Sequence, residues 1–172
     1  LGYVFAFGVA KVAEGVAGSS CRTVSGRRAA ELYVENCKVD ADGAVGDIDG
    51  ALPWIEHVSD EAIAAMCAEA CGAMKVANEQ TVEYSRTRKQ FGVPIGKFQV
   101  LQHRMVDMFI EHEQSISMTY MATLKLDEDA VTRKKAVSAA KVRIGQAGRF
   151  VGQEAEKIPG GRGMRDGVAV GH

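Results

Sequence analysis

Apolar residues recur at three- and four-residue intervals in three long stretches of the chain, which is the period of an amphipathic helix. The first stretch covers about residues 60–87, with Ser59 as the expected N-cap and an alanine-rich stripe on one face. The other two cover about residues 97–127 and 132–158. Because the connections between the three stretches are short, the pattern predicts antiparallel neighbours in a helical bundle.

The N-terminal part of the chain follows the two-residue period of a β-strand instead. Its first apolar residues alternate with small ones, at Tyr3, Phe5, Phe7 and Val9. A turn at Ser25-Gly26 leads into a second apolar run, Ala29 to Val39. Two or three strands are too few to bury a sheet on their own. We therefore predict a mainly α fold, with residues 1–50 as part of a β domain and residues 51–172 as a helical bundle domain.

Composition and charge exclude several classes of function. The 172 residues are 47% hydrophobic and 25% charged, and the net charge is −1 at pH 7. This composition is typical of soluble globular proteins, and the near-neutral charge gives no support to nucleic-acid binding. No run of about 18 apolar residues occurs, so we expect no membrane span.

The cysteines and histidines do not have the spacing of a metal site. Cys67 and Cys71 lie four residues apart on a predicted helix, where they are expected to be small core residues. His103 and His112 share a helix face, but no further ligand accompanies them, so we expect no metal site. Free thiols favour a reducing compartment, and hence the cytoplasm.

Most of the candidate chemistry lies between the first two predicted helices. This junction contains Arg88-Lys-Gln-Phe-Gly, then Pro94-Ile95, then Phe98-Gln99. An arginine suits a bidentate phosphate contact, and Phe91 offers an aromatic face. The same residues also fit a cationic loop that simply ends a helix, with its phenylalanines buried. A second turn, Gly160-Gly-Arg-Gly, fits either a close backbone approach to a ligand or a helix C-cap.

Together, these two motifs resemble the signature of the acyl-CoA dehydrogenases. The resemblance covers nearly the whole chain, from the end of the family's middle β-barrel domain through three helices of its C-terminal bundle. This corresponds to roughly the second half of one subunit without its tail. The resemblance implies α,β-dehydrogenation of an acyl-CoA thioester, with FAD as hydride acceptor and electron-transfer flavoprotein as the next acceptor. Because the family's FAD contacts come from two subunits, it also implies a dimer or a tetramer.

The resemblance also implies roles for particular residues. Arg88 would contact the flavin pyrophosphate of a neighbouring subunit, with Phe91 and Gln99 beside the adenosine half. The turn at Gly160 and Gly161 would reach the FAD of the adjacent subunit. Just before that turn, Lys157 is a candidate cofactor contact where the family usually has a glutamine, and Pro159 replaces a common aromatic residue or histidine.

The family abstracts the α-proton with a glutamate, and this chain offers one candidate base. In many members the glutamate follows the last motif; in others it lies early in the first bundle helix, at about Ala62 here. Glu61 is the adjacent carboxylate, although an adjacent residue on a helix points about 100° away. Alternatively, Asp60 and Glu61 are first-turn acids that favour the helix dipole.

A second hypothesis makes the chain a truncated or non-catalytic subunit of a heteromeric acyl-CoA dehydrogenase. Such a subunit would oligomerise through its helices and would lack its own active site. Both hypotheses predict a helical oligomer, but only the first predicts bound flavin.

Overall fold

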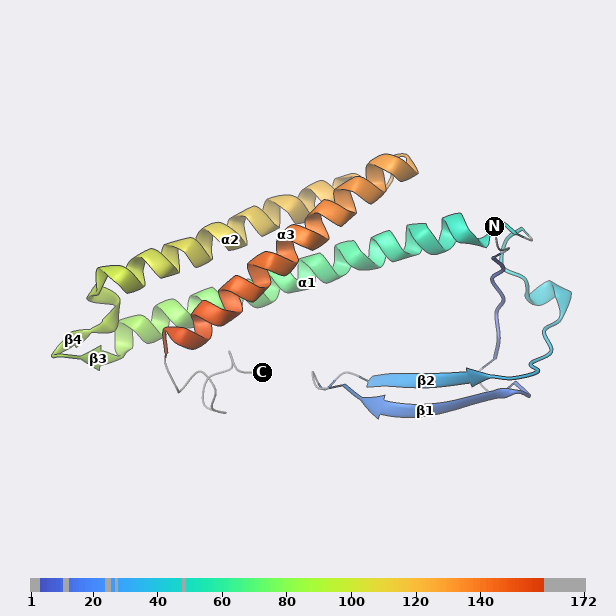
Figure 1. Ribbon diagram of the computed structural model, residues 1–172, viewed down its shortest axis with the longest axis horizontal. Coiled ribbons are helices and arrows are strands. Elements are labelled where there is room, and N and C mark those ends of the chain that lie inside the picture. Colours follow the sequence, from blue (N-terminus) through green and yellow to red (C-terminus); the bar gives the residue numbers. More distant parts are fainter. Residues whose placement is uncertain (1–3, 11–12, 24–25, 27, 48, 160–172) are drawn as a thin grey trace. The chain divides into compact units, whose positions relative to one another are not determined.

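A computed structural model describes the chain except residues 1–3, 11–12, 24–25, 27, 48 and 160–172. The chain divides into two units, Leu1–Glu56 and His57–His172, which are described separately below. Figure 1 labels the elements, which follow in the order β1 (Val16–Arg22), β2 (Arg28–Val34), α1 (Ala51–Thr87), β3 (Lys89–Gln90), β4 (Val93–Pro94), α2 (Gln99–Leu124) and α3 (Ala130–Lys157). Short 3-10 turns, Ala41–Gly43 (η1) and Ile95–Lys97 (η2), precede α1 and α2.

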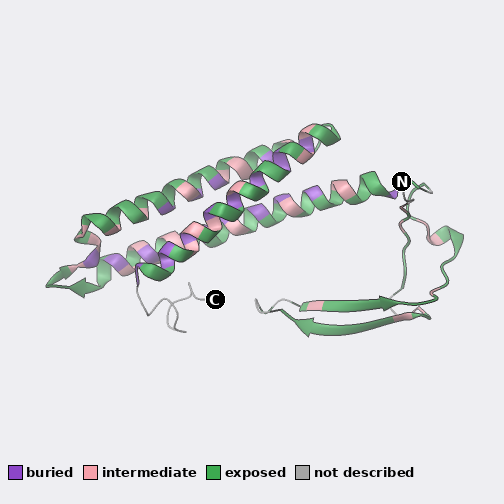
Figure 2. Ribbon diagram, viewed as in Figure 1, coloured by how far each residue is buried: buried purple, intermediate pink, exposed green. Residues whose placement is uncertain are grey.

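The described part of the first unit is built around an antiparallel pair of strands. Val16 of β1 pairs with Val34 of β2, and Arg22 pairs with Arg28. The predicted run from Ala29 to Val39 is wrong at its end, because Asn36 has a φ of 51° and turns the backbone out of the extended conformation. Most side chains of this pair are exposed (Figure 2).

The strand expected around residues 3–9 is also wrong. Within its described part, Phe7 forms only an isolated bridge to Ala44. The strand that pairs with β2 is β1, in which Gly18 lies opposite Leu32. A turn at Gly15, with a φ of 85°, sets the start of β1, and a Cβ there would lie 2.2 Å from the Glu35 carbonyl oxygen. Glycine is required there on both counts.

The second unit confirms the mainly helical prediction. α2 and α3 lie close to the predicted ranges, but α1 begins at Ala51, earlier than predicted, and Ser59 is inside the helix. Pro53 is tolerated because it lies in the first turn of α1, where its missing N–H would have no partner within the helix. Within the described residues, none of the helices is long and apolar enough to cross a membrane.

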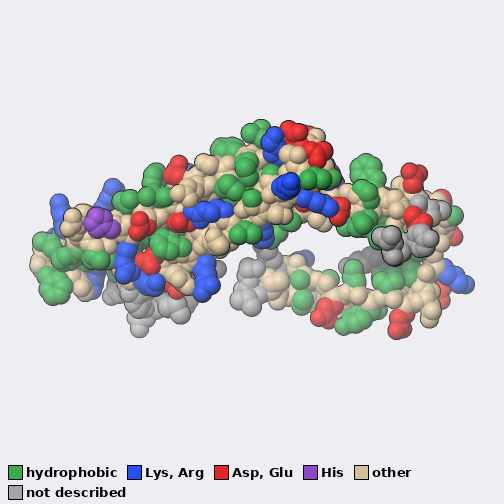
Figure 3. All heavy atoms as spheres, turned by 45° about the horizontal axis from the view of Figure 1, so that its top comes forward, with side chains coloured by type: hydrophobic (Ala, Val, Ile, Leu, Met, Phe, Trp, Pro, Cys, Tyr) green, Lys and Arg blue, Asp and Glu red, His purple; other side chains and the backbone are tan. Residues whose placement is uncertain are grey.

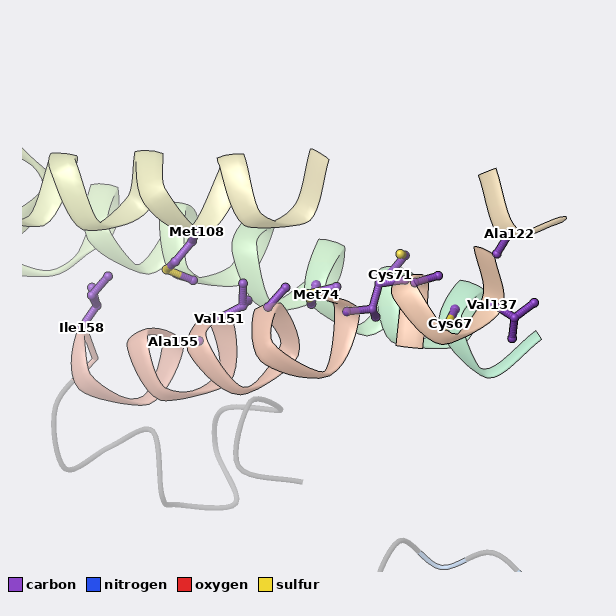
Figure 4. Packing of buried hydrophobic residues seen from close by; sticks show 12 residues of the cluster. Cys67, Cys71, Met74, Met108, Ala122, Val137, Val151, Ala155 and Ile158 are labelled. Carbon is purple, nitrogen blue, oxygen red and sulfur yellow. The ribbon is translucent and has the colours of Figure 1, made fainter. Parts of the chain in front are cut away.

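The core of the helical unit consists mainly of small and flexible side chains. It contains Cys67, Cys71, Met74, Met108, Ala122, Val137, Ala140, Ile144, Ala147, Val151, Ala155 and Ile158. Figure 4 shows side chains from all three helices in this cluster. The expectation that Cys67 and Cys71 are core residues is therefore confirmed. Burial raises the pKa of the Cys67 thiol, which keeps it in its neutral form.

A buried ion pair joins α1 to α3. The Nε of Arg133 donates to Oδ2 of Asp60 at 2.9 Å, and each residue is only 8% exposed. Asp60 is therefore not the first-turn acid expected from the sequence, because α1 begins nine residues before it. Removing one partner of such a pair leaves the other as an uncompensated buried charge.

We expect Arg133→Met to lower the free energy of unfolding by about 3 kcal/mol, because Asp60 would keep its buried charge without a partner. The double variant Asp60→Leu/Arg133→Met should recover most of this loss, since neither charge remains. Urea unfolding of the three proteins measures the effect.

The exposed Lys125–Glu128 pair, at 3.0 Å, supplies the control. Lys125→Met should change stability by less than about 0.5 kcal/mol. An Arg133→Met effect no larger than this would contradict the structural role of the buried pair.

Candidate functional site

A tight hairpin follows α1 and carries the aromatic residue singled out in the sequence. Gln90 of β3 pairs with Val93 of β4, so the turn consists of two residues, Phe91 and Gly92. Their φ angles are 54° and 84°. Two consecutive positive φ angles are typical of a type I′ turn, for which the usual first residue is asparagine, aspartate or glycine. A bulky phenylalanine at this position stores backbone strain.

Phe91 is also highly exposed, which excludes the simple buried role considered for it. Its side chain is 91% exposed, and its ring meets that of Phe98 edge to face, with the centroids 6.2 Å apart. Solvent exposure and backbone strain are both unfavourable for an aromatic residue. Phe91 is therefore a candidate for a contact outside this chain.

Phe91 forms part of the rim of a pocket of about 430 Å³. The pocket lies where the end of α1, the hairpin, the start of α2 and the end of α3 meet. Its apolar lining includes Ile95, Phe98, Leu101, Ile158 and Pro159, and its polar lining includes Tyr84 and Arg88. Figure 3 shows hydrophobic and cationic side chains side by side at the hairpin end of the bundle.

Arg88 combines a fixed backbone with an available side chain. Its N–H donates to the Tyr84 carbonyl at 2.9 Å, and its own carbonyl accepts from the Ile95 N–H at 2.8 Å. Among the described residues, its guanidinium has neither a hydrogen bond nor an ion pair. Arg88 can therefore offer a planar fork of donors to a phosphate or carboxylate.

The loop between the hairpin and α2 is held closely against α1. A Cβ on Gly96 would lie 2.9 Å from Oγ and 3.1 Å from the carbonyl oxygen of the buried Ser85, so only glycine allows this approach. The amide of Gln102 donates to the Gly96 carbonyl at 2.8 Å. These contacts hold in place the loop that carries the pocket-lining residues Ile95 and Phe98.

The structure does not bring all the predicted cofactor residues to the pocket. Gln99 is the exposed first residue of α2 and is not part of the lining. Lys157 points to its own helix, where Nζ donates to Oε1 of Glu154 at 2.9 Å. Gly160 and Gly161 lie outside the described residues. The roles of these four residues stay predictions.

The candidate base is remote from the pocket within one chain. Glu61 is half-exposed and lies 3.1 Å from Nε2 of His57, one helical turn earlier. Along α1, the 23 residues from Glu61 to Tyr84 correspond to roughly 35 Å. Any role of Glu61 therefore concerns a site other than this pocket.

A buried carboxylate close to the pocket was missed by the sequence reasoning. Glu154 is 7% exposed and accepts from Nη1 of Arg104 and from Nζ of Lys157, each at 2.9 Å. A carboxylate on the apolar stripe of the third helix, between Val151 and Ala155, was the available signal. The partner on α2 could not be found from local spacing.

The two cations determine the charge state of this carboxylate. Burial alone would raise the pKa of Glu154, but the Lys157 hydrogen bond and the Arg104 charge outweigh it, so the pKa lies below its usual value of 4.5. A depressed pKa means that the folded state binds the proton more weakly than the unfolded state. Glu154 therefore stabilises the fold above about pH 4.5, and this contribution is lost as the pH falls through the folded-state pKa.

Comparison with known proteins identifies the family. The family model for the C-terminal domain of acyl-CoA dehydrogenases matches residues 58–172, so this chain belongs to the acyl-CoA dehydrogenase family. A short-chain specific acyl-CoA dehydrogenase of Megasphaera elsdenii is 30% identical over 145 residues, which cover 79% of this chain and 38% of the relative. The chain spans between 21% and 38% of the length of the curated relatives compared.

Solved structures agree with this assignment. Butyryl-CoA dehydrogenase from Megasphaera elsdenii matches with a TM-score of 0.86 and 26% identity, over 98% of this chain and 44% of that one. The FAD complex of PigA matches with the same TM-score and identity, over 96% of this chain and 44% of that one.

We expect Phe91→Asn to raise the free energy of unfolding by about 1 kcal/mol, because asparagine tolerates the left-handed conformation that strains phenylalanine. Thermal or urea unfolding measures the change. Phe98→Ala is the contrasting variant and should lower stability, since Phe98 is partly buried. A clear loss of stability in Phe91→Asn would show that the turn does not store the strain inferred here.

Proposed function

We propose that this chain is the FAD-contacting half of a flavin-dependent acyl-CoA dehydrogenase, which acts by α,β-dehydrogenation of an acyl-CoA thioester. The observation that carries the proposal is the exposed, strained Phe91 on the rim of a pocket that also presents the guanidinium of Arg88, which is unpaired among the residues that the structure describes. Family membership supports the reaction class. The FAD complex of PigA and the butyryl-CoA dehydrogenase structure support the cofactor and the substrate class.

The residues present suit the two halves of a dinucleotide. A pyrophosphate favours a rigid bidentate cation, which Arg88 supplies. An adenine ring favours an aromatic or apolar face, which Phe91 and the apolar lining supply. The pocket volume of about 430 Å³ lies within the usual range for small-molecule sites. When bound, FAD would supply the hydride acceptor of the reaction.

The exposure of Phe91 favours a ligand shared between subunits. An aromatic ring that is 91% exposed contributes little to its own chain and can contact a group held by another. We therefore include a homodimer or tetramer in the proposal, with electron-transfer flavoprotein as the next electron acceptor. Gln99, Gly160 and Gly161 stay proposed contacts of the same cofactor.

A flavin titration of the purified chain tests the proposal. The wild-type protein should show a flavin absorption band that co-elutes with a dimer or tetramer. Arg88→Gln should weaken FAD binding at least about tenfold, because a charge-assisted phosphate contact is lost. Arg86→Gln is the matched control, since Arg86 is a nearby exposed arginine outside the pocket lining.

A colourless wild-type protein that ignores added FAD would overturn the proposal for this chain. Equal losses in Arg88→Gln and Arg86→Gln would mean that binding reflects general positive charge and not the pocket.

Glu61 stays the proposed base, because it is the carboxylate next to the position that some family members use. Since it lies roughly 35 Å along α1 from the pocket, it would act beside a different FAD from the one that Arg88 of the same chain contacts. If Glu61 abstracts the α-proton, Glu61→Gln should lower acyl-CoA-dependent flavin reduction by at least about 100-fold and leave flavin content unchanged. Stopped-flow bleaching of the flavin band measures this rate. An unchanged rate would remove Glu61 from the mechanism and leave flavin binding unaffected as a proposal.

A further inference from the structure

We infer that Glu154 is a positioning residue for the pocket beside the hairpin. It holds Arg104 of α2 and Lys157 of α3 together, and this fixes the wall formed by Ile158 and Pro159 against the first turn of α2. The ligand of the pocket rests on the function proposed above, whereas the positioning role rests on the contacts of this chain alone.

The buried carboxylate needs both of its partners. Glu154 is 7% exposed, and an isolated carboxylate at such a position would be strongly unfavourable. Each of its two oxygens accepts from a different cation at 2.9 Å. Arg104 and Lys157 are about half exposed, so their charges stay partly hydrated while their donors converge on the buried oxygens.

The cluster lies one helical turn from the pocket on both helices. On α2, Leu101 lines the pocket and lies three residues before Arg104, which places both on neighbouring positions of one face. On α3, the Ile158 N–H donates to the Glu154 carbonyl at 3.0 Å, so the last turn continues from Glu154 to the pocket wall. A shift of Glu154 relative to Arg104 would therefore move Ile158 relative to Leu101.

Directional contacts are needed here because the nearby core specifies position weakly. Val151 and Ala155 lie on either side of Glu154 in the sequence, and both belong with Met108 of α2 to the hydrophobic core (Figure 4). Small side chains and a flexible methionine pack adequately in more than one arrangement. The two directional hydrogen bonds that Glu154 accepts favour one arrangement. The charges of Glu154, Arg104 and Lys157 add up to +1, next to a pocket that already contains Arg88.

A second ion pair between the same two helices provides a matched control. Arg143 of α3 contacts Glu111 and Gln114 of α2. Glu111 lies ten residues after Leu101, or roughly 15 Å along α2, so its pair does not touch the pocket. Glu111→Gln and Glu154→Gln remove the same chemical group from the same helix–helix contact at different distances from the site.

The test compares Glu154→Gln with Glu111→Gln in the full chain. Arg104→Gln is a second variant that disrupts the same ion pair from the side of α2. Methyl-labelled isoleucine and leucine report the distance between Ile158 and Leu101 by NMR, and a fluorescence titration reports FAD affinity. We expect Glu154→Gln to change the distance between the Ile158 and Leu101 methyl groups and to reduce FAD affinity about tenfold. Arg104→Gln should act in the same direction, and Glu111→Gln should change neither quantity.

An unchanged distance between Ile158 and Leu101 in Glu154→Gln, or equal changes in Glu154→Gln and Glu111→Gln, would overturn the inference. If the wild-type chain binds no FAD, the proposed function fails, but the distance between the Ile158 and Leu101 methyl groups still decides whether Glu154 positions the pocket wall. Partial recovery in Glu154→Asp, which keeps the charge and shortens the side chain, would assign the effect to the carboxylate.

Discussion

Two ion pairs, each formed by a buried carboxylate and an arginine, set the arrangement of the three helices. Near its start, α3 contributes Arg133, which pairs with Asp60 of α1. Near its end, α3 contributes Glu154, which pairs with Arg104 of α2. The core between them consists mainly of alanine, cysteine, methionine and valine, whose shapes alone specify the register weakly. Because each pair is costly to break from one side, α3 is fixed to a different helix at each end.

This arrangement determines where the candidate site can form. α1 and α2 are joined by a short hairpin and a loop that Gly96 allows to lie against Ser85, so the ends of these helices are held side by side. The end of α3 contributes the remaining wall of the pocket, through Ile158 and Pro159, at the position set by Glu154. The site therefore depends on local turn chemistry for one wall and on a long-range ion pair for the other.

Local patterns in the sequence predict much of this structure, and long-range pairs explain what they miss. The helical period predicts the ranges of α2 and α3 closely, and the junction motif singles out Arg88 and Phe91, which line the same pocket. Each of these signals is contained within a short stretch of sequence. The burial of Asp60 depends on a partner 73 residues away, and that of Glu154 on one 50 residues away. No spacing rule connects such residues. From the sequence alone, an acid that pairs with a distant arginine therefore cannot be distinguished from an acid that stabilises a helix N-terminus.

Backbone strain points to the same site as the family motif does, and it does so independently. Among the described residues, three non-glycine positions have a positive φ: Asn36, Asp49 and Phe91. Asparagine and aspartate tolerate this conformation because their short polar side chains can hydrogen-bond locally, whereas phenylalanine has no such compensation. Natural sequences break local rules chiefly where function requires it. A bulky, exposed aromatic residue kept in a turn that favours asparagine is therefore best explained by a contact that the isolated chain does not make.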